Sequence, residues 1–557
     1  MGSSERPPRY PADGPLSTEA VDGVARSAGV VGGATLASRV LGLLRDVVLA
    51  GSFLPGATDA FFIAFMIPNL FRRLVAEGSL TVSFVPVFTT WLSRSREEAR
   101  EVLDATWTLA ALVGLVLTIL GIFFADELVS LFAPGFALDE GKHELSVALL
   151  RLCFPYILLL MLVAVAMGAL NALGHFLYPA LAPVLLNVSL ITAALLGFAF
   201  LEQPILALGW GVLIAGVLQV LIQLPPLRAR GFTPRRRFAP RDPAMRRLGR
   251  LMGPAILGAS VFQLNIVVAR FLSSFLGDGA VSYLYYADRL LEFPLGVFVF
   301  ALGTASLPSF ARLAKGDPTR LREAFSGTLR LALALSLPST VGLILVREEI
   351  FRVLFAWNPS VFGEAAVLGC ARALGFFALG LVPITVSRIC VALCFAHEEA
   401  RLPARAAVIG FLVHLITALA LIGPLPEGVL PASLIRFQHA LVLVDLGYAG
   451  LAAAASVAAL VNALYLLWVV GRRFGPLLGA ADALGVLRLG AGCAVLALGV
   501  FGARWLLPAQ VEAGIRGLAM LSTFVLAGTA SYVAALVVLG SPELRSLAKV
   551  LSRRPRS

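Results

Sequence analysis

The sequence has little of what catalytic, redox and metal-dependent proteins use. Its 557 residues include five cysteines and five histidines, and only 14% of them are charged. All the cysteines fall in apolar segments, and although Cys390 and Cys394 are one helical turn apart, no further cysteine or nearby histidine completes a metal site. No histidine pairs with a carboxylate in a catalytic arrangement, and we find no nucleotide-binding loop or nucleophile elbow. We therefore expect no enzyme activity, no metal and no cofactor, and cysteines that are buried free thiols.

Apolar residues are what the chain has in excess. They make up 59% of it, and the mean hydropathy is +0.89. Because lipid admits only helices or closed barrels, and the apolar runs are of helix length, we predict an all-α polytopic membrane protein with about 14 transmembrane helices. The predicted spans lie near 25–50, 58–87, 103–124, 147–172, 178–200, 205–227, 248–275, 281–308, 327–346, 365–395, 403–423, 446–470, 485–506 and 516–540. Internal prolines at Pro68, Pro155, Pro294, Pro338 and Pro383 are expected to allow kinks.

The basic residues predict the topology of these spans. The net charge of +12 could suggest nucleic acid, but most Lys and Arg lie in short loops between apolar runs, above all in the stretch 228–250. These basic loops alternate with loops that carry few cations, which is the pattern of the positive-inside rule. Residues 1–22 are polar and lack the apolar core of a signal peptide, so we expect a disordered tail and both termini in the cytoplasm. The 228–250 loop either links two halves of a transporter or, more simply, anchors the chain at an anionic lipid surface.

Charged residues inside two apolar stretches are the strongest functional signal. Residues 38–79 carry Arg39, Arg45, Asp46, Asp59, Arg72, Arg73 and Glu77, and a later span carries Asp288, Arg289 and Glu292. A charge at membrane depth is costly unless it faces a wet cavity or a partner. Arginine predominates, and its guanidinium group can form paired hydrogen bonds with phosphate oxygens. We infer a water-filled cationic cavity for an anionic substrate.

Spacing separates the charges with local partners from those without. If the first span rises about 1.5 Å per residue from about residue 25, Arg39 lies roughly 20 Å along it, near mid-membrane. Arg73 and Glu77 are four residues apart, so they are expected to pair with each other rather than with a substrate. Arg39, Arg45 and Arg72 have no such partner, and we expect them to face an anion. Arg289 is ambiguous, because Glu292 is three residues away.

Four further arginines lie in or at the ends of spans. Arg388 lies deep in its span, so it and Arg372 are candidates for additional cavity charges. The alternative for Arg151, Arg270 and Arg372 is that their side chains extend to the membrane interface.

Several segments together resemble a known family. They are SRVLGLLRD, ATDAFFIAFMIPNLFRRLVAEGSLTVSFVPVF, LLRLCFPYILLL, MGPAILGASV and YYADRLLEFPLGVFVFALGTASLPS. These are similar to the signature segments of the MurJ (MviN) lipid II flippases, within the multidrug/oligosaccharidyl-lipid/polysaccharide exporter superfamily. The resemblance runs through all the predicted spans in order.

The resemblance implies a bacterial inner-membrane protein that moves the undecaprenyl-pyrophosphate-linked peptidoglycan precursor to the periplasmic leaflet by alternating access. It implies two six-helix lobes around a central cavity, with two C-terminal helices forming a groove for the lipid tail. The corresponding parts are a cytoplasmic tail (1–22), a first lobe (23–227), a basic linker (228–250), a second lobe (251–472), the two further spans (473–542) and a basic tail (543–557). Partners would be lipid II, membrane lipids and, as candidates, cell-wall synthesis enzymes, with no nucleic acid.

Matching residue by residue, the substrate-binding positions are Arg39, Arg45, Arg72, Arg289, Ser38 and Ser282. Positions expected to gate the cavity or orient the arginines are Asp59, Glu292, Glu77 and Asp288. Two departures stand out: residues 424–446 are longer than the connection expected there, and span 403–423 lacks an acidic residue for a sodium site.

Three other functions remain open. A multidrug or cation antiporter of the same superfamily would need an anionic or aromatic cavity, which the arginines argue against. A flippase for another prenyl-linked glycan fits the span count and the cationic cavity equally well. A membrane scaffold for cell-wall enzymes would not need Arg45.

Overall fold

The computed structural model describes residues 18–314, 316–475, 477–507 and 512–544. In these ranges every regular element is a helix, apart from one isolated antiparallel bridge between Ile422 and Asp445. Residues 1–17 and 545–557, which hold most of the two predicted tails, lie outside the described residues.

The first half of the chain forms a continuous series of helices. They are α1 (Thr18–Ser52), α2 (Pro55–Phe71), the π-helical η1 (Arg72–Leu80), α3 (Thr81–Leu92), α4 (Arg96–Phe123), α5 (Ala125–Phe132), the 3₁₀-helical η2 (Pro134–Leu138), α6 (Glu140–Cys153), α7 (Tyr156–Ala172), α8 (Leu177–Phe200) and α9 (Leu206–Arg228).

The second half is built in the same way. Its helices are α10 (Pro243–Ser273), α11 (Ala280–Pro294), the π-helical η3 (Leu295–Val299), α12 (Phe300–Leu313), α13 (Pro318–Leu345), α14 (Arg347–Leu354), α15 (Glu364–Leu379), α16 (Leu381–Ala396), α17 (Arg401–Leu421), α18 (Ala432–Leu441), α19 (Tyr448–Phe474), α20 (Ala480–Leu506) and α21 (Ile515–Val538).

Ten helical segments of the described chain are long and apolar enough to cross a membrane, which confirms the polytopic helical class. They correspond to α4, α6 with α7, α8, α9, α13, α15 with α16, α17, α19, α20 and α21. The other four predicted spans correspond to α1, to α2–η1–α3, to α10 and to α11–η3–α12. The predicted charged stretches lie in α1, α2–η1 and α11, so the helices that fall short in hydropathy include those that carry the candidate site.

Most of the predicted proline kinks coincide with breaks between helical segments. Pro68 and Pro294 lie near the ends of α2 and α11, and a π-helical segment follows each of them. Pro155 separates α6 from α7, and Pro383 follows the break between α15 and α16. Pro338 differs, because α13 continues through it as one helix. A proline removes one backbone hydrogen bond and crowds the preceding turn, which favours such breaks without requiring them.

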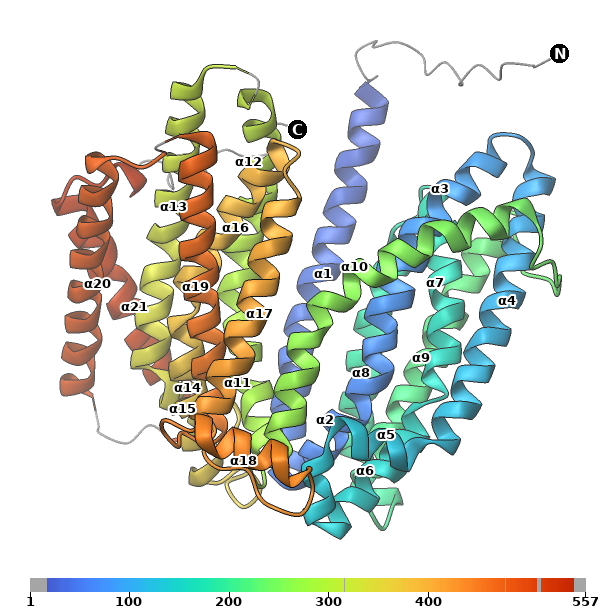
Figure 1. The fold of residues 1–557 in the computed structure, drawn as a ribbon, viewed down its shortest axis with the longest axis horizontal. Helices are drawn as coiled ribbons and strands as arrows, with labels where there is room; N and C mark the ends of the chain where they lie inside the picture. The colour runs from blue at the N-terminus through green and yellow to red at the C-terminus, as the bar shows by residue number, and fades with distance from the viewer. Residues whose placement is uncertain (1–17, 315, 476, 508–511, 545–557) are drawn as a thin grey trace.

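The helices form two groups that are closest at one end (Figure 1). Helices α1 to α9 make the first group and α11 to α21 the second, while α10 runs obliquely between them and packs on η1 and α3. We call the end that carries α5, α6 and α18, at the bottom of Figure 1, the α18 end. Toward the opposite end, α1 and the second group diverge.

An apolar core joins the two groups at the α18 end. One cluster of buried side chains contains Phe61 and Phe62 of α2 together with Tyr286 of α11, Phe355 and Phe362. The rings of Phe62 and Tyr286 lie 5.5 Å apart, edge to face, and Tyr286 packs in turn on Phe355 at 5.4 Å. Aromatic pairs of this kind add to the free energy of burying their area. This end is therefore packed in the described structure.

At the opposite end, the basic connection between α9 and α10 is attached to α4. The backbone N–H of Arg235 donates to Asp104 at 2.8 Å, and Arg237 forms an ion pair with Glu101 at 2.7 Å. The basic stretch thus has an intramolecular binding surface, which neither of the two sequence interpretations included.

Candidate functional site

The first charged cluster joins α1 to α11 around one tyrosine. It consists of Arg45, Asp46, Asn187, Tyr285, Arg289 and Glu292, and we call it the Tyr285 cluster. Arg45 and Asp46 come from α1, Asn187 from α8, and the other three from α11. The Tyr285 hydroxyl accepts hydrogen bonds from Arg45 Nη2 at 2.7 Å and from Arg289 Nη2 at 3.0 Å. Tyr285 of the second helix group thus contacts one guanidinium group from each of the two helix groups.

Arg45 has partners that its spacing did not reveal. Its Nε and Nη2 donate to Asp46 Oδ1 at 2.9 and 2.6 Å, and its Nη1 donates to Asn187 at 3.1 Å. The sequence indicated no partner for Arg45 at helical spacing, and the partners found here are an adjacent residue and residues of other helices, which that spacing rule does not cover. Arg45 and Asp46 are both buried. A charge pair that is buried requires hydrogen bonds on all sides.

All three nitrogens of the Arg289 guanidinium donate hydrogen bonds, and one of these bonds crosses between the groups. Its Nε donates to Asp46 Oδ2 at 2.9 Å, across the groups, and its Nη1 donates to Glu292 at 2.6 Å. The pairing of Arg289 with Glu292 suggested by their spacing is confirmed. Glu292 is exposed, as is Asp288 on the same helix.

Arg39 and Ser38 lie nearer the start of α1 than Arg45 does. Arg39 is exposed, and its Nη1 lies so close to Gly296 of η3 that a Cβ at that glycine would be 1.6 Å away. Arg39 therefore reaches the second group, and its guanidinium occupies the space beside Gly296. The backbone carbonyl of Ser38 accepts a hydrogen bond from Asn187 Nδ2 at 3.0 Å, and the other end of that amide binds Arg45.

Arg72 lies beside a different set of side chains. It opens the π-helical η1, its Nε donates to Asn69 at 2.7 Å, and it lines a cavity of about 60 Å³. Most of the cavity wall comes from α7, α8 and α9 and is apolar, with Tyr156 and Gln219 as polar members. The side chain of Glu77 lies outside the described residues, so the predicted pair of Arg73 with Glu77 stays a prediction.

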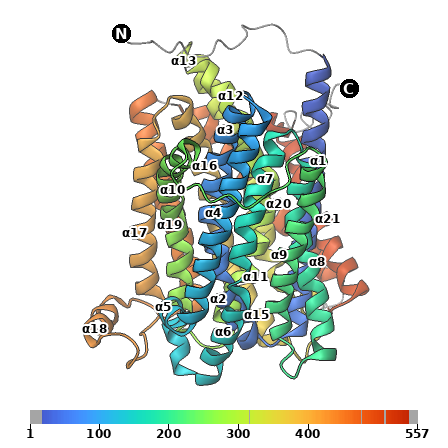
Figure 2. The same ribbon diagram turned by 90° about the vertical axis from the view of Figure 1, so that its right-hand side faces the viewer.

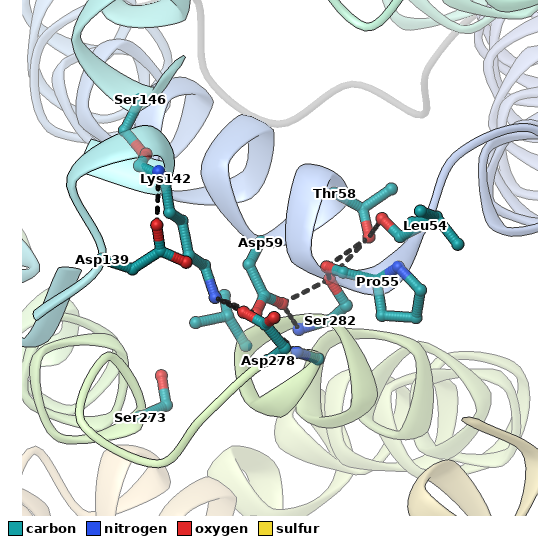
Figure 3. Close-up of polar contacts among 12 residues, drawn as sticks. Leu54, Pro55, Thr58, Asp59, Asp139, Lys142, Ser146, Ser273, Asp278 and Ser282 are labelled. Atoms are coloured by element: carbon teal, nitrogen blue, oxygen red, sulfur yellow. Dashed lines mark hydrogen bonds and ion pairs between the residues drawn. The ribbon is translucent and has the colours of Figure 1, made fainter. Parts of the chain in front are cut away.

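The second charged cluster lies at the α18 end (Figure 3). We call Asp59, Lys142, Asp278, Gly279 and Ser282 the Asp59 cluster. Asp59 of α2 is completely buried and accepts hydrogen bonds from the backbone N–H groups of Gly279 at 2.8 Å and Ser282 at 2.7 Å. These groups belong to the N-terminus of α11, where the helix dipole favours a negative charge. The Ser282 hydroxyl donates to Asp59 at 2.6 Å, so the sequence-predicted Asp59 and Ser282 meet across the groups.

Lys142 supplies the counter-charge of Asp59. Its ammonium donates to Asp59 Oδ2 at 2.9 Å and to Asp278 Oδ1 at 2.8 Å, and lies 4.5 Å from the centre of the Phe136 ring. Lys142 comes from α6 in the first group and Asp278 from the loop before α11 in the second. Gly279 has φ +84, a backbone conformation that favours glycine, and it allows α11 to begin directly beneath the carboxylate.

Two further contacts join the groups at this end. Trp357 Nε1 donates to the carbonyl of Val47 at 2.9 Å, and Asn358 Nδ2 donates to that of Gly51 at 3.0 Å. A Cβ at Gly51 would lie 2.1 Å from the indole ring of Trp357. In addition, the N–H of Gly135 in η2 donates to the hydroxyl of Ser274, directly after α10, at 3.0 Å.

Sequence reasoning missed Lys142, Asp278, Asn187 and Tyr285, and it misjudged Arg270. Lys142 and Asp278 lie in polar stretches near the ends of spans, where charges are ordinary, so no sequence signal marked them. Arg270 was considered for extension to the membrane interface. Instead its Nη1 donates to the Val281 carbonyl at 2.7 Å, and its guanidinium lies 5.7 Å from the centre of the Tyr285 ring. Arg372 and Arg388 lie on α15 and α16, outside the two clusters.

Two groups of membrane-spanning helices that pack together at one end and diverge at the other are an arrangement typical of membrane transporters. The fold is similar to that of a solved structure described as "Lipid II flippase MurJ, inward closed conformation", with a TM-score of 0.73 and 25% identity over 91% of this chain and 98% of that one. It also resembles an inward-facing multidrug resistance MATE family transporter of the MOP superfamily, with a TM-score of 0.60 and 15% identity over 82% and 96% of the two chains. The second likeness concerns the fold alone.

The family model "Lipid II flippase MurJ" matches residues 55–515, and the chain belongs to this family. The "Probable lipid II flippase MurJ" of Bdellovibrio bacteriovorus is 34% identical over 94% of this chain and 96% of its own length. The "Lipid II flippase MurJ" of Burkholderia cenocepacia is 38% identical over 68% and 74% of the two chains. Membership makes the chain a membrane transporter rather than an enzyme, in agreement with the sequence prediction.

Proposed function

We propose that this protein moves lipid II, the undecaprenyl-pyrophosphate-linked peptidoglycan precursor, from the cytoplasmic to the periplasmic leaflet by alternating access. The moving bodies would be the two lobes predicted from the sequence, residues 23–227 and 251–472, connected through 228–250. Family membership supports the substrate. The observation that carries the mechanism is that Arg45 and Arg289, from different groups, share Tyr285 and Asp46.

Pyrophosphate is the part of lipid II that these arginines fit. Each guanidinium has several N–H donors in a fixed plane, and charge-assisted bonds to phosphate oxygens are among the strong hydrogen bonds of proteins. Asp46, Glu292 and Tyr285 hold those donors in position. An entering pyrophosphate would compete with Asp46 and Glu292, and Arg39 and Arg72 would add positive charge on the approach to it.

Binding at this point would act on both helix groups at once. Arg289 bonds to Asp46 across the groups, so a substrate that takes over the Arg289 donors weakens one of the contacts that keep the groups together. Such coupling is what alternating access requires, because a ligand shifts a conformational equilibrium only through a difference in its affinity for the two states.

The Asp59 cluster would be the gate of the transport path at the α18 end. It contains two sequence-predicted residues, Asp59 and Ser282, and Lys142 adds an ion pair to both groups. For the substrate to leave at this end, α11 must withdraw from Asp59 and Asp278 from Lys142. Asp59 and Lys142 both belong to the first group, so the buried carboxylate would keep its counter-charge when the gate opens.

The α18 end would face the periplasm. The basic stretch 228–250 lies at the opposite end, and cationic loops remain in the cytoplasm by the positive-inside rule. Both termini would then be cytoplasmic, in the inner membrane of a bacterium.

The prenyl chain of the substrate would stay in lipid, beside residues 473–542. This pair of helices is attached to α13 by ion pairs of Arg330 with Asp482 at 3.5 Å and with Glu543 at 3.4 Å. Next to it lies a cavity of about 190 Å³ with Phe325, Leu467, Val470, Leu477 and Leu478 in its wall. An apolar wall of this kind is suited to an isoprenoid. Cell-wall synthesis enzymes remain candidate partners.

The test is lipid II exposure on the outer face of bacteria depleted of their own flippase. We expect wild type to restore exposure and Arg45→Ala to abolish it at equal protein level. Arg352→Ala is the matched control, because Arg352 pairs with Glu364 on the surface of the second group, away from both clusters. A well-inserted wild type that restores nothing would favour another prenyl-linked glycan, and an active Arg45→Ala variant would favour the scaffold.

A further inference from the structure

Between α17 and α19 the chain carries an exposed apolar surface that the transport mechanism does not use. It belongs to residues 424–446, the stretch that is longer than the sequence comparison led us to expect. On α18, Leu434 and Phe437 are 55% and 61% exposed, and just after the helix Leu443 is 80% exposed. Positions 434, 437 and 441 are three and four residues apart, so they lie on one face of α18. Arg436, which is also exposed, lies on another face.

These side chains are held in place rather than left on a loose loop. Gln438 is buried, and its Nε2 donates to the carbonyls of Leu419 and Gly423 at 3.0 and 2.8 Å. The Gln438 Oε1 accepts from the N–H of Leu425 at 3.0 Å, and the N–H of Leu443 donates to the Ala420 carbonyl at 2.9 Å. The segment thus folds back on the end of α17, and the neighbouring side of α18, which carries the buried Ile435 and Gln438, is turned toward it.

The position of α18 indicates what covers this face. Helix α17 is one of the apolar membrane-spanning segments, and it exposes Val408, Leu412 and Ile416, spaced four residues apart. Helix α18 projects sideways at the end of α17, on the same side of the molecule (Figure 2). The lipid-facing surface of α17 therefore continues onto α18 at the depth where the span ends.

We propose that α18 is an interfacial helix that binds the lipid leaflet at the α18 end. Leu434, Phe437 and Leu443 enter the boundary between headgroups and acyl chains, and Arg436 remains among the lipid phosphates. Helices with one apolar face and a cationic polar face lie in the plane of the interface in this way. The occupant is lipid rather than a protein partner, because the patch continues the surface of a membrane span.

This binding gives the second helix group a fixed depth at the gate. Helix α18 is bonded to the end of α17 and is followed by α19. Helices α17 and α19 pack along each other. When the Asp59 cluster opens, the first group would then move against a second group that the leaflet holds in place.

The experiment measures the depth of single spin labels in liposomes of phosphatidylethanolamine and phosphatidylglycerol. All five native cysteines are buried, so introduced cysteines are labelled selectively. Labels at Phe437→Cys and Leu443→Cys are expected to collide with oxygen several-fold more, relative to a water-soluble nickel complex, than a label at Glu427→Cys on the same segment. A Phe437 label as accessible to nickel as the Glu427 label overturns the proposal. Shielding from both reagents also overturns it, because it indicates a protein contact.

A second pair of variants tests the apolar face itself. The double change Leu434→Gln with Phe437→Gln is expected to move the label at Leu443→Cys toward water. The matched double change Ser433→Gln with Ala440→Gln alters exposed positions to which the proposal gives no lipid contact, and it should leave that label at its depth. Unchanged depth in both would show that the apolar side chains do not hold α18 at the interface.

Discussion

Two charged clusters join α11 to the first helix group, and they use their donors differently. In the Tyr285 cluster, Arg45 and Arg289 face Asp46 and Glu292, and Arg289 and Glu292 are partly open to the surroundings. In the Asp59 cluster, the carboxylate is completely buried and receives an ammonium, a hydroxyl and two backbone N–H groups. The first therefore holds cationic donors that an anion can take over. The buried carboxylate of the second cluster already has all the donors it needs, and we propose that this cluster is a latch that keeps the α18 end closed.

The difference between the Tyr285 cluster and the Asp59 cluster explains why one fold has both of them near one helix. A substrate site must exchange partners at little cost, so its groups are multiply hydrogen-bonded but partly accessible. A latch must favour one state strongly, which a buried carboxylate at a helix N-terminus achieves through dipole and ion pair together.

A large loss of transport is expected for the charge-preserving change Arg289→Lys in the Tyr285 cluster. Lysine keeps the charge but cannot bond to Asp46, Glu292 and Tyr285 at once, and each hydrogen bond to a charged group contributes about 1.5–3 kcal/mol. We expect lipid II transport to fall roughly tenfold or more, measured as outer-face exposure at equal expression. Arg352→Lys, which alters an Arg–Glu pair within the second group, should transport normally. Normal transport by Arg289→Lys would show that charge alone suffices there.

Asp59→Asn should open the latch. The substitution removes the charge that accepts hydrogen bonds from Gly279 and Ser282 of the second group. Each hydrogen bond to a charged group contributes about 1.5–3 kcal/mol, and this loss falls on the state in which the groups touch. Spin labels at Leu138→Cys and Ser360→Cys, exposed positions in the two groups at this end, should report a longer distance population. Asp126→Asn is the control, since Asp126 pairs with His143 inside the first group at 3.0 Å. An unchanged distance distribution in Asp59→Asn would mean that the apolar core alone keeps this end closed.

Gly51→Ala is expected to weaken the contact of the two helix groups at the α18 end, by a smaller amount than Asp59→Asn does. The added methyl group would overlap Trp357 and break its hydrogen bond to Val47, and such overpacking costs about 1–3 kcal/mol. The same label pair should show an intermediate shift. Gly33→Ala on the same helix meets nothing within 4 Å and should show none. Equal behaviour of the two alanine variants would argue against Trp357 as part of the closed contact.

The helical class could be predicted because hydropathy and span length are local properties of the sequence. The charged spans were recognisable for the same reason: an arginine in an apolar run stands out wherever its partner lies. Arg289 with Glu292 was predictable, since both lie on one helix at a spacing that brings them together.

Contacts between distant helices could not be predicted in this way. Asn187 reaches Arg45 across 142 positions, and Lys142 reaches Asp59 across 83. A lysine near a span end is unremarkable in sequence, and only the packing of α6 on α2 turns it into the counter-charge of a buried aspartate. The same applies to Arg270, whose distance from the membrane interface depends on the oblique course of α10.

The smallest effect is expected for Asp278→Asn, and it provides the sharpest comparison. Asp278 and Asp59 bond to the same ammonium at 2.8 and 2.9 Å, but the Asp278 side chain is 71% exposed while that of Asp59 is buried. Exposed ion pairs contribute at most about 1 kcal/mol, since water and salt screen them. The label distances should therefore stay near those of wild type, and added salt should change them little. If Asp278→Asn opened the α18 end as far as Asp59→Asn, Lys142 would be the centre of the latch and burial of Asp59 would not matter. A weak effect of Asp278→Asn together with a strong effect of Asp59→Asn would assign the latch to the buried carboxylate and the α11 N-terminus.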